Sequence, residues 1–401
     1  MTLVPKLFFC IFLLFLMIFL PVRGEAGTDE ILLGMSAPLS GPTAKIGTAV
    51  RDGILAGIAR INREGGVNGR PLRLIVLDDG YEPTRTAPNM RRLIEEEGVL
   101  AVIGNVGTPT AITSLPLAKK SGTLLFAPFS GAGVLRQEPP ERYVINFRAS
   151  YAEEIGAMVD ALIAEGGLRP RDIAFFTQRD GYGDAGYSAG LAALTRHGLE
   201  DERRVVHVRY PRNTLAVENA LADLLLAEPA PRAVIMVGAY APCAKFIDLA
   251  RRSGLDALFL SVSFVGGDFL AEKLAPDVEG VIVTQVVPHP DLDLPIVRDY
   301  VADSRHYDTK LAPNFVGLEG YIAVRLLGRA LATIEGVPTR EGVIDALEEL
   351  DTFDLGLGRA LHLGRNDHQA SHEIWATRLQ GGRLVPFTWP QIPSLLTQSE
   401  P

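Results

Sequence analysis

The run of residues from 31 to 61 constrains the fold more than any other part of the chain. Residues 31–36 are an apolar stretch of strand length, and the small residues at 38–42 end it. Isoleucine and valine then recur from Ile46 to Ile61 at the spacing of one helix face. A strand, a tight loop and an amphipathic helix form the first half of a βαβ unit, whose loop can hold a ligand against backbone N–H groups.

A helix stop and a second strand complete this unit. Gly65-Gly66 follows the apolar helix face and is typical of a left-handed helix C-terminus. Asn68-Gly69 predicts a tight turn, and residues 72–77 form the next apolar strand, which ends in Asp78-Asp79. We therefore expect the two strands to run parallel, joined by a crossover helix.

The alternation of strand and helix continues along the chain. Further apolar strands are expected at residues 99–104, 124–127, 173–177, 204–208, 233–237, 257–260 and 281–287. Such strands predict mainly parallel sheets that carry helices on both faces. The pattern breaks near Arg148, which separates two series and predicts an α/β protein of two lobes. Strands at 373–379 and 384–388 and a loose tail at 390–401 are expected to end the chain.

The first 24 residues have the features of a secretory signal peptide. Lys6 supplies a short positive region, residues 7–20 are apolar, and Val22-Arg23-Gly24 places small residues where a signal peptidase cleaves. The apolar run is short for a membrane span, although an uncleaved N-terminal anchor is the alternative. We therefore expect a periplasmic protein.

Charge and cysteine content narrow the class of partner. The chain carries a formal net charge of −9, which argues against nucleic acid or an anionic membrane as its partner. Of two cysteines, Cys10 would leave with the signal peptide, so Cys243 would have no intrachain disulfide partner. We expect Cys243 to pack at the start of a helix.

Motifs that would indicate an enzyme are weak. Residues 186–190 match the G-x-S-x-G pattern of hydrolases, but Ser188 is expected inside a helix rather than at a strand-to-helix turn. His362, His368 and His372 are close in sequence, yet their surroundings predict a solvated turn rather than a metal site. No cofactor-binding motif is present, so we predict no catalytic residue, cofactor or metal.

Candidate ligand-binding loops follow the predicted strands at their carboxyl ends, where open parallel sheets bind ligands. The loops are residues 40–41, 105–108 and 129–131 in the first series and 180–182, 239–240 and 262–263 in the second. Their hydroxyls and glycines can present donors to a carboxylate, and their aromatic residues can cover an apolar ligand. Two sheets that face each other would bring these loops together.

Several of these segments resemble the leucine/isoleucine/valine-binding proteins, the extracytoplasmic receptors of ABC importers. The resemblance rests on Ser40-Gly41-Pro42, Gly65-Gly66-Val67-Asn68-Gly69, Asp78-Asp79, Asp180-Gly181-Tyr182-Gly183-Asp184 and Gly238-Ala239-Tyr240, within a region from Ile31 to about Phe387. It implies the two-lobed periplasmic binding protein fold, with three crossings between the lobes. The implied crossings lie near Arg148, Pro288 and Asp354. The implied lobes are residues 27–148 with 289–354 and residues 149–288 with 355–389.

The resemblance also implies the ligand-binding residues. They are Ile46, Thr108, Phe129, Ser130, Gly131, Tyr182, Tyr240 and Ser263. In the family a glutamate receives the ligand ammonium; Ser263 stands in its place, and only Asp268 or Asp180 could substitute for that charge. Because an unpaired buried ammonium is costly, we expect a ligand without an α-ammonium group, such as an aromatic or aliphatic carboxylate or an amide. A branched-chain amino acid is the alternative.

Three functional hypotheses follow. The first is a periplasmic receptor that closes its lobes on a small ligand and presents the closed form to an ABC permease. The second is a module that reports the ligand to a transmembrane sensor. The third is an enzyme on an α/β scaffold, which has the least support because no nucleophile–base pair is evident.

Overall fold

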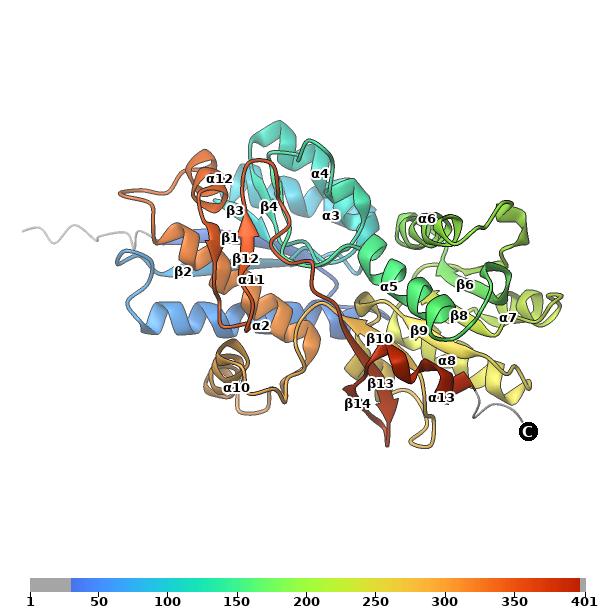
Figure 1. The fold of residues 1–401 in the computed structure, drawn as a ribbon. Helices are drawn as coiled ribbons and strands as arrows, with labels where there is room; N and C mark the ends of the chain where they lie inside the picture. The colour runs from blue at the N-terminus through green and yellow to red at the C-terminus, as the bar shows by residue number, and fades with distance from the viewer. Residues whose placement is uncertain (1–29, 397–401) are drawn as a thin grey trace, which may run out of the picture.

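Two lobes lie side by side in the computed structural model, which describes residues 30–396 (Figure 1). The predicted signal peptide lies outside the described residues. Lobe one, on the left of Figure 1, contains a five-stranded parallel sheet in the order β2-β1-β3-β4-β5. Its strands are β1 (Ile31–Ala37), β2 (Leu72–Asp78), β3 (Ala101–Ile103), β4 (Leu124–Phe126) and β5 (Val144–Ile145). The parallel pairing predicted for the first two strands is confirmed.

Helices from both ends of the chain surround this sheet. They are α2 (Ala44–Arg63), α3 (Pro83–Arg91), α4 (Thr108–Ser121), α10 (Pro295–Tyr307), α11 (Phe315–Leu331) and α12 (Arg340–Glu348). Helix α3 had not been expected from the sequence. α2 and α11 approach closely because glycines meet at their contact: a Cβ on Gly53 would lie 1.9 Å from the carbonyl oxygen of Gly317. This contact fixes a late helix against the first βαβ unit.

Lobe two contains a seven-stranded sheet in the order β14-β13-β10-β9-β8-β6-β7. Its strands are β6 (Ile173–Gln178), β7 (His207–Tyr210), β8 (Ala233–Val237), β9 (Leu258–Ser261), β10 (Ile282–Gln285), β13 (Trp375–Gln380) and β14 (Arg383–Pro386). β13 runs antiparallel to both of its neighbours, and the other pairs are parallel. β7 starts later than the strand predicted at 204–208, because residues 202–204 form a 3₁₀ turn.

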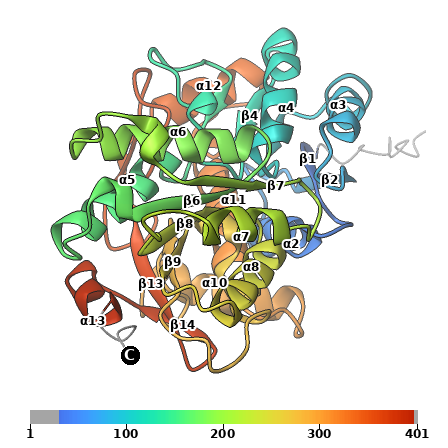
Figure 2. The ribbon, with the colours of Figure 1, turned by 90° about the vertical axis from the view of Figure 1, so that its right-hand side faces the viewer.

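Helices cover both faces of the second sheet. They are α5 (Tyr151–Ala164), α6 (Gly181–Arg196), α7 (Glu218–Leu225), α8 (Tyr240–Arg252) and α9 (Gly267–Ala271). Figure 2 shows α5 and α6 on one face of the sheet and α7 and α8 on the other. The predicted fold class, an α/β protein of two lobes with helices on both faces of mainly parallel sheets, is confirmed.

The turn chemistry after α2 agrees with the sequence. Gly65 and Gly66 have φ angles of +105° and +75°, as a left-handed helix C-terminus requires. Asn68 and Gly69 also have positive φ angles, and Val67 and Arg70 pair across the turn that they make. The predicted end of the first βαβ unit is therefore confirmed.

The third crossing between the lobes comes later than predicted. β11 (Asp351–Phe353) pairs with β12 (Leu361–Leu363) in an antiparallel ladder, which lies on the lobe-one side in Figure 1. Gln369 then bridges to Asn146 at the end of lobe one's sheet before the chain enters β13. We therefore correct the crossing near Asp354 to the segment after β12. Both strands are three residues long, which is too short to give a clear alternation.

The end of the chain is not a loose tail throughout. Residues 392–396 form the short helix α13, and three of its side chains, Ile392, Leu395 and Leu396, are buried. They pack beside Gly166, where a Cβ would lie 3.0 Å from Leu396 Cδ1. The prediction of a loose tail is wrong for residues 392–396, because their apolar side chains pack against Gly166 of lobe two. Residues 397–401 lie outside the described part of the chain.

The predicted solvated turn forms at residues 364–367, and His362 and His372 are exposed, but the prediction is wrong for His368. His368 is buried, with Nδ1 2.8 Å from the Val144 carbonyl oxygen and Nε2 3.1 Å from Glu348 Oε1. His362 lies in β12, and His372 contacts Glu153. Between residues 30 and 396, no group of three or more His, Cys, Asp or Glu residues could hold a metal ion.

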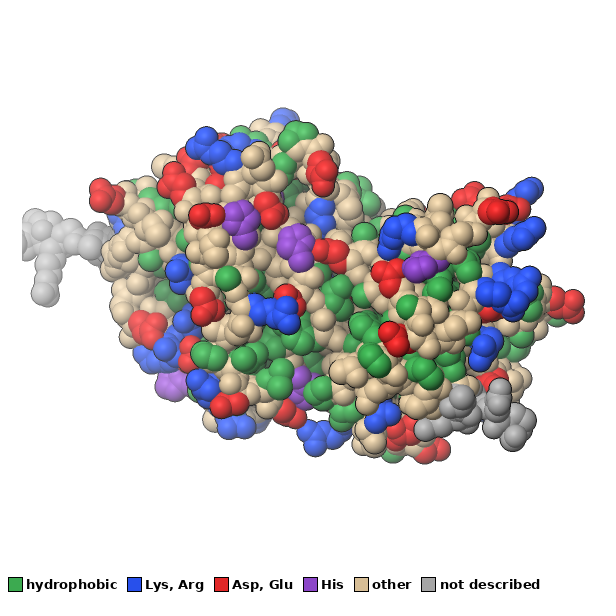
Figure 3. All heavy atoms as spheres, viewed as in Figure 1, with side chains coloured by type: hydrophobic (Ala, Val, Ile, Leu, Met, Phe, Trp, Pro, Cys, Tyr) green, Lys and Arg blue, Asp and Glu red, His purple; other side chains and the backbone are tan. Residues whose placement is uncertain are grey.

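On the face shown in Figure 3, acidic and basic side chains are interspersed over both lobes. Some of them form networks; Arg142 Nη2, for example, lies 2.7 Å from Asp345 Oδ1 and 2.9 Å from Glu341 Oε2. Of the helices described, none is long and apolar enough to cross a membrane.

The G-x-S-x-G segment serves packing. Ser188 is exposed within α6, as predicted, and not at a turn. A Cβ on Gly186 would lie 2.6 Å from Val237 Cγ2, and a Cβ on Gly190 would lie 2.2 Å from Phe175 Cζ. The glycines therefore allow α6 to approach β6 and β8.

Gly190→Ala should destabilise the protein. Overpacking against the buried Phe175 ring costs about 1–3 kcal/mol, which exceeds the roughly 0.5–1 kcal/mol that alanine gains over glycine in a helix. Ser188→Ala is the matched control on the same helix and should stay within about 0.5 kcal/mol of the natural protein. Urea titration measures both; equal midpoints for the two variants would contradict this packing.

Candidate ligand-binding site

The candidate site is built where the carboxyl ends of the two sheets meet. In lobe one, the loops after β3 and β4 run side by side: Gly107 N donates to the Phe129 carbonyl oxygen at 3.1 Å, and Phe129 N donates to the Asn105 carbonyl oxygen at 2.8 Å. This pairing brings the Thr108 and Ser130 hydroxyls within 2.8 Å of each other, and both are buried. Two of the predicted ligand-binding residues therefore form one hydroxyl pair.

Helix α5 places a third hydroxyl, that of Tyr151, beside the Thr108 and Ser130 pair. A capping box starts the helix: Ser150 Oγ accepts from Glu153 N at 3.1 Å, and Glu153 Oε2 accepts from Ser150 N at 2.6 Å. The box fixes Tyr151, whose backbone N donates to the Gly131 carbonyl oxygen at 2.7 Å. A Cβ on Gly131 would lie 2.6 Å from the Tyr151 ring, so the ring lies against the predicted Gly131 position.

Aromatic rings from both lobes fill the space beside the hydroxyls. Phe264 of lobe two is central, with its ring centroid 5.6 Å from Phe129, 4.5 Å from Tyr182 and 6.0 Å from Tyr81. Tyr151 contacts Tyr182 at 5.3 Å between centroids. All five rings are buried, so the lobes are closed on one another through aromatic contacts.

Tyr81 reaches this cluster through an unusual backbone conformation. Its φ angle is +64°, and its backbone N donates to Asp79 Oδ1 at 2.9 Å. The ring lies over Gly107, where a Cβ would come within 2.1 Å of it. Gln178 of lobe two donates to the Tyr81 hydroxyl at 3.4 Å, so the ring bridges the lobes.

Arg148 places a positive charge at the inner end of the cluster. Its side chain has no exposed surface, and its guanidinium lies 4.7 Å from the centroid of the Phe129 ring. Nη2 donates to Ser263 Oγ and lies 3.6 Å from Glu154 Oε1, whereas Nε lies 3.6 Å from Glu319 Oε1. Nε and Nη1 are buried without a hydrogen-bond partner.

The two glutamates beside Arg148 differ in their surroundings. Glu154 accepts hydrogen bonds from Ser263 N at 2.7 Å, Ser263 Oγ at 3.0 Å and Thr284 Oγ1 at 2.6 Å. Burial raises the pKa of Glu154, and Arg148 and these donors oppose that shift. Burial raises the pKa of Glu319 to about 7, with Arg148 as the main opposing influence.

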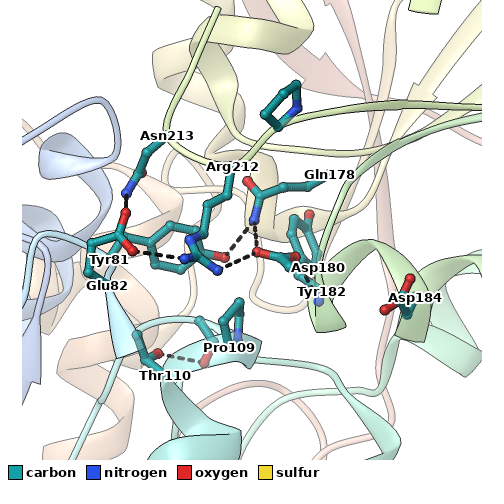
Figure 4. Close-up of polar contacts among 12 residues, drawn as sticks. Tyr81, Glu82, Pro109, Thr110, Gln178, Asp180, Tyr182, Asp184, Arg212 and Asn213 are labelled. Atoms are coloured by element: carbon teal, nitrogen blue, oxygen red, sulfur yellow. Dashed lines mark hydrogen bonds and ion pairs between the residues drawn. The ribbon is translucent and has the colours of Figure 1, made fainter. Parts of the chain in front are cut away.

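Polar contacts close one rim of the cluster (Figure 4). Arg212 of lobe two donates to Glu82 Oε2 of lobe one at 2.8 Å and lies 3.3 Å from Asp180 Oδ2. Asn213 donates to Glu82 Oε1 at 2.6 Å. This group of Glu82, Asp180, Arg212 and Asn213 is called the rim network below.

The structure separates the predicted site residues into a central set and a peripheral set. The central set comprises Thr108, Phe129, Ser130, Gly131, Tyr182 and Ser263. Ile46 is buried near Gly266, where a Cβ would lie 3.5 Å from Ile46 Cγ1. Tyr240 lies apart, with its ring edge against Phe269, whose ring is 5.5 Å from the Lys45 ammonium.

The two candidate ammonium partners already have protein donors. Asp180 begins α6 and accepts from Tyr182 N at 3.0 Å and from Gln178 Nε2 at 2.7 Å. Asp268 accepts from Phe315 N at 3.0 Å across the lobes, and burial raises its pKa. Their role toward a ligand stays a prediction.

Sequence reasoning missed five residues of the central cluster. They are Tyr81, Arg148, Tyr151, Phe264 and Glu319. Arg148 was noted only as a boundary between lobes, although an arginine between Phe147 and Ala149 at a strand end was a usable signal. Glu319 sits in the apolar helix α11, where a lone acid within a buried face also indicates a specific partner.

A family model for periplasmic binding proteins matches residues 30–383, and the chain belongs to that family. A relative from Pseudomonas aeruginosa, the leucine-, isoleucine-, valine-, threonine- and alanine-binding protein, is 26% identical over 259 residues. That match covers 64% of this chain and 66% of the relative, slightly under two thirds of its length. The resemblance to the leucine/isoleucine/valine-binding proteins is confirmed.

Solved structures agree with this assignment. A possible leucine/isoleucine/valine-binding protein from Rhodopirellula baltica is 49% identical, with a TM-score of 0.89 over 92% of this chain and 99% of that one. A substrate-binding periplasmic protein from Ralstonia solanacearum is 28% identical, with a TM-score of 0.81 over 89% and 99%. A solute-binding protein from R. palustris, solved with benzoate, is 20% identical with a TM-score of 0.77 over 89% and 95%, which shows the fold alone.

Glu319 should make stability depend on pH. Its pKa in the folded protein, about 7, lies above the ordinary value of 4.5, so the folded state holds a proton that the unfolded state loses. The free energy of unfolding contributed by this group is full below pH 4.5 and falls as pH rises to about 7. Glu319→Gln should remove that decline, on the order of 3 kcal/mol.

Denaturant titrations at several pH values between 4 and 8 measure this effect. The surface variant Glu349→Gln is the control and should retain the pH dependence of the natural protein. Parallel stability curves for the natural protein and Glu319→Gln would show that Glu319 does not hold the proton.

Proposed function

We propose that this protein is an extracytoplasmic solute-binding receptor of an ABC importer, which captures a small carboxylate- or amide-bearing ligand by closure of its two lobes. The observation that carries the proposal is the shared cluster. Thr108 and Ser130 come from lobe one, Tyr182 and Phe264 from lobe two, and all are buried where the lobes meet. A ligand held there touches both lobes and favours the closed form.

The surroundings of Ser263 support a ligand without an α-ammonium group. The carboxylate of its neighbour Glu154 already accepts hydrogen bonds from the Ser263 backbone N, the Ser263 hydroxyl and the Thr284 hydroxyl. The positive charge beside that carboxylate is Arg148, a residue of the protein itself. A ligand ammonium would therefore meet an existing cation, whereas a carboxylate or amide oxygen would meet donors.

The relatives support a receptor function, and they differ in the chemical class of ligand that their names give. The P. aeruginosa relative is named for amino acids, and the R. palustris protein was solved with benzoate. The permease partner and export to the periplasm through a cleavable signal peptide are part of the proposal, and an extracytoplasmic family supports both.

Calorimetry with the twenty amino acids, a set of aromatic and aliphatic carboxylates, and their amides tests the ligand class. We expect binding among the carboxylates or amides and none by leucine, isoleucine or valine. At a hundred times its dissociation constant, the ligand should add about 2.7 kcal/mol to the stability of the protein. Small-angle scattering should show compaction on saturation, and an unchanged radius of gyration would rule out hinge closure.

Arg212→Met should weaken ligand binding without unfolding the protein. The Arg212–Glu82 pair joins the lobes, so its loss favours the open form, and a partly exposed pair of this kind is worth about 0.2–1 kcal/mol. The expected result is a rise of up to about fivefold in Kd. Arg92→Met is the matched control, because Arg92 pairs with Glu97 within lobe one. An equal change in both variants would exclude a role for the rim network.

A further inference from the structure

We propose that Arg148 anchors the carboxylate of an aromatic monocarboxylate ligand, and that this carboxylate replaces Glu319 as the partner of the guanidinium. The inference rests on the proposed function and names the class of ligand for that receptor. It assigns the charge recognition to a residue on the first crossing between the lobes, outside the loops that the sequence had indicated.

The Arg148 guanidinium has unpartnered donors where the two lobes meet. Arg148 is fully buried, yet its Nε and Nη1 make no hydrogen bond. A buried donor without a partner costs roughly 1–3 kcal/mol, more for a charged group, so such donors indicate a missing acceptor. Arg136 Nη2 donates a hydrogen bond to the Arg148 carbonyl oxygen at 2.9 Å, and this bond fixes the backbone at Arg148.

A second buried donor lies near Arg148. The Tyr151 hydroxyl lies beside the Thr108 and Ser130 hydroxyls but has no hydrogen bond of good geometry. It belongs to the group that contains the Thr108 and Ser130 hydroxyls, which pair with each other at 2.8 Å. A carboxylate has two oxygens, so one can accept from Arg148 and the other from this hydroxyl group.

Glu319 is the weaker of the two acidic partners of Arg148. Glu154 accepts three hydrogen bonds from lobe two, whereas Glu319 Oε1 only approaches Arg148 Nε, at 3.6 Å. A ligand carboxylate would be a third acid beside this guanidinium, so it binds best when Glu319 is protonated or has moved away. Glu319 on α11 is therefore the group that the ligand carboxylate displaces from the Arg148 guanidinium.

The rest of the cluster fits an aromatic body. Phe129 of lobe one and Phe264 of lobe two pack across the junction, tilted by 45° with centroids 5.6 Å apart, and Tyr182 and Tyr81 lie against Phe264. A small separation of the lobes would admit a flat ring between the phenylalanines and keep ring contacts on both sides. An aliphatic carboxylate would meet the same charge but lose these ring contacts.

Isothermal calorimetry with benzoate, benzamide, cyclohexanecarboxylate and L-leucine tests the inference on the full mature protein. Benzoate should bind at least tenfold more tightly than benzamide, which has the same shape without the charge, and more tightly than cyclohexanecarboxylate. Arg148→Met should weaken benzoate binding by about 10–100-fold and leave benzamide binding within about threefold. Arg92→Met, an exposed arginine in lobe one, is the control and should bind benzoate as the natural protein does.

Glu319→Gln separates this inference from its rival. If a ligand carboxylate competes with Glu319, the variant should bind benzoate several-fold more tightly; if Glu319 recognises a ligand ammonium, the variant should instead bind leucine more weakly. The comparison of benzoate with benzamide uses the natural protein, so it still tests the inference if Arg148→Met fails to fold.

Equal affinity for benzoate and benzamide, or no binding by any carboxylate, would overturn the inference. Binding of leucine with compaction in scattering, independent of Arg148, would also overturn it while leaving the receptor function intact. Failure of every ligand to compact the protein would instead count against the proposed function itself.

Discussion

The buried ion group around Arg148 is the interaction on which the closed arrangement of the lobes depends. A guanidinium without exposed surface is costly unless charges and acceptors surround it. Its partners come from both sides of the junction: Glu319 lies on α11 of lobe one, and Glu154 and Ser263 lie in lobe two. Separation of the lobes would expose the group to water, so its electrostatic environment changes with the conformation of the protein.

The aromatic cluster and the rim network act with this ion group. Phe264 touches rings from lobe one, and Arg212 pairs with Glu82 across the rim. Neither is strong alone, because a ring pair is worth about 0.5–1.5 kcal/mol and a partly exposed ion pair about 0.2–1 kcal/mol. Modest contacts of this kind suit a receptor, since a ligand with a few kcal/mol of differential affinity can then shift the population between open and closed forms.

Much of the fold was predictable from the sequence because its signals are local. The positive φ angles of Gly65, Gly66 and Asn68 follow from residue type and position, and the apolar strands followed from composition. The short helix α13 and the late third crossing were not predictable. Their positions depend on partners distant in the chain, such as Gly166 beneath Leu396 and Asn146 beside Gln369.

The candidate site shows the same division between local and distant information. Thr108, Ser130 and Tyr182 were found because they follow strands, but Arg148 became a site residue only through contacts with Ser263, 115 positions later. Those contacts explain the substitution that had seemed to remove charge recognition. A serine at position 263 donates to Glu154 and accepts from Arg148, so it links an internal carboxylate to an internal cation. In the proposal made above, the unpartnered donors of the Arg148 guanidinium accept an anionic ligand group, in place of the ammonium that the family resemblance implies.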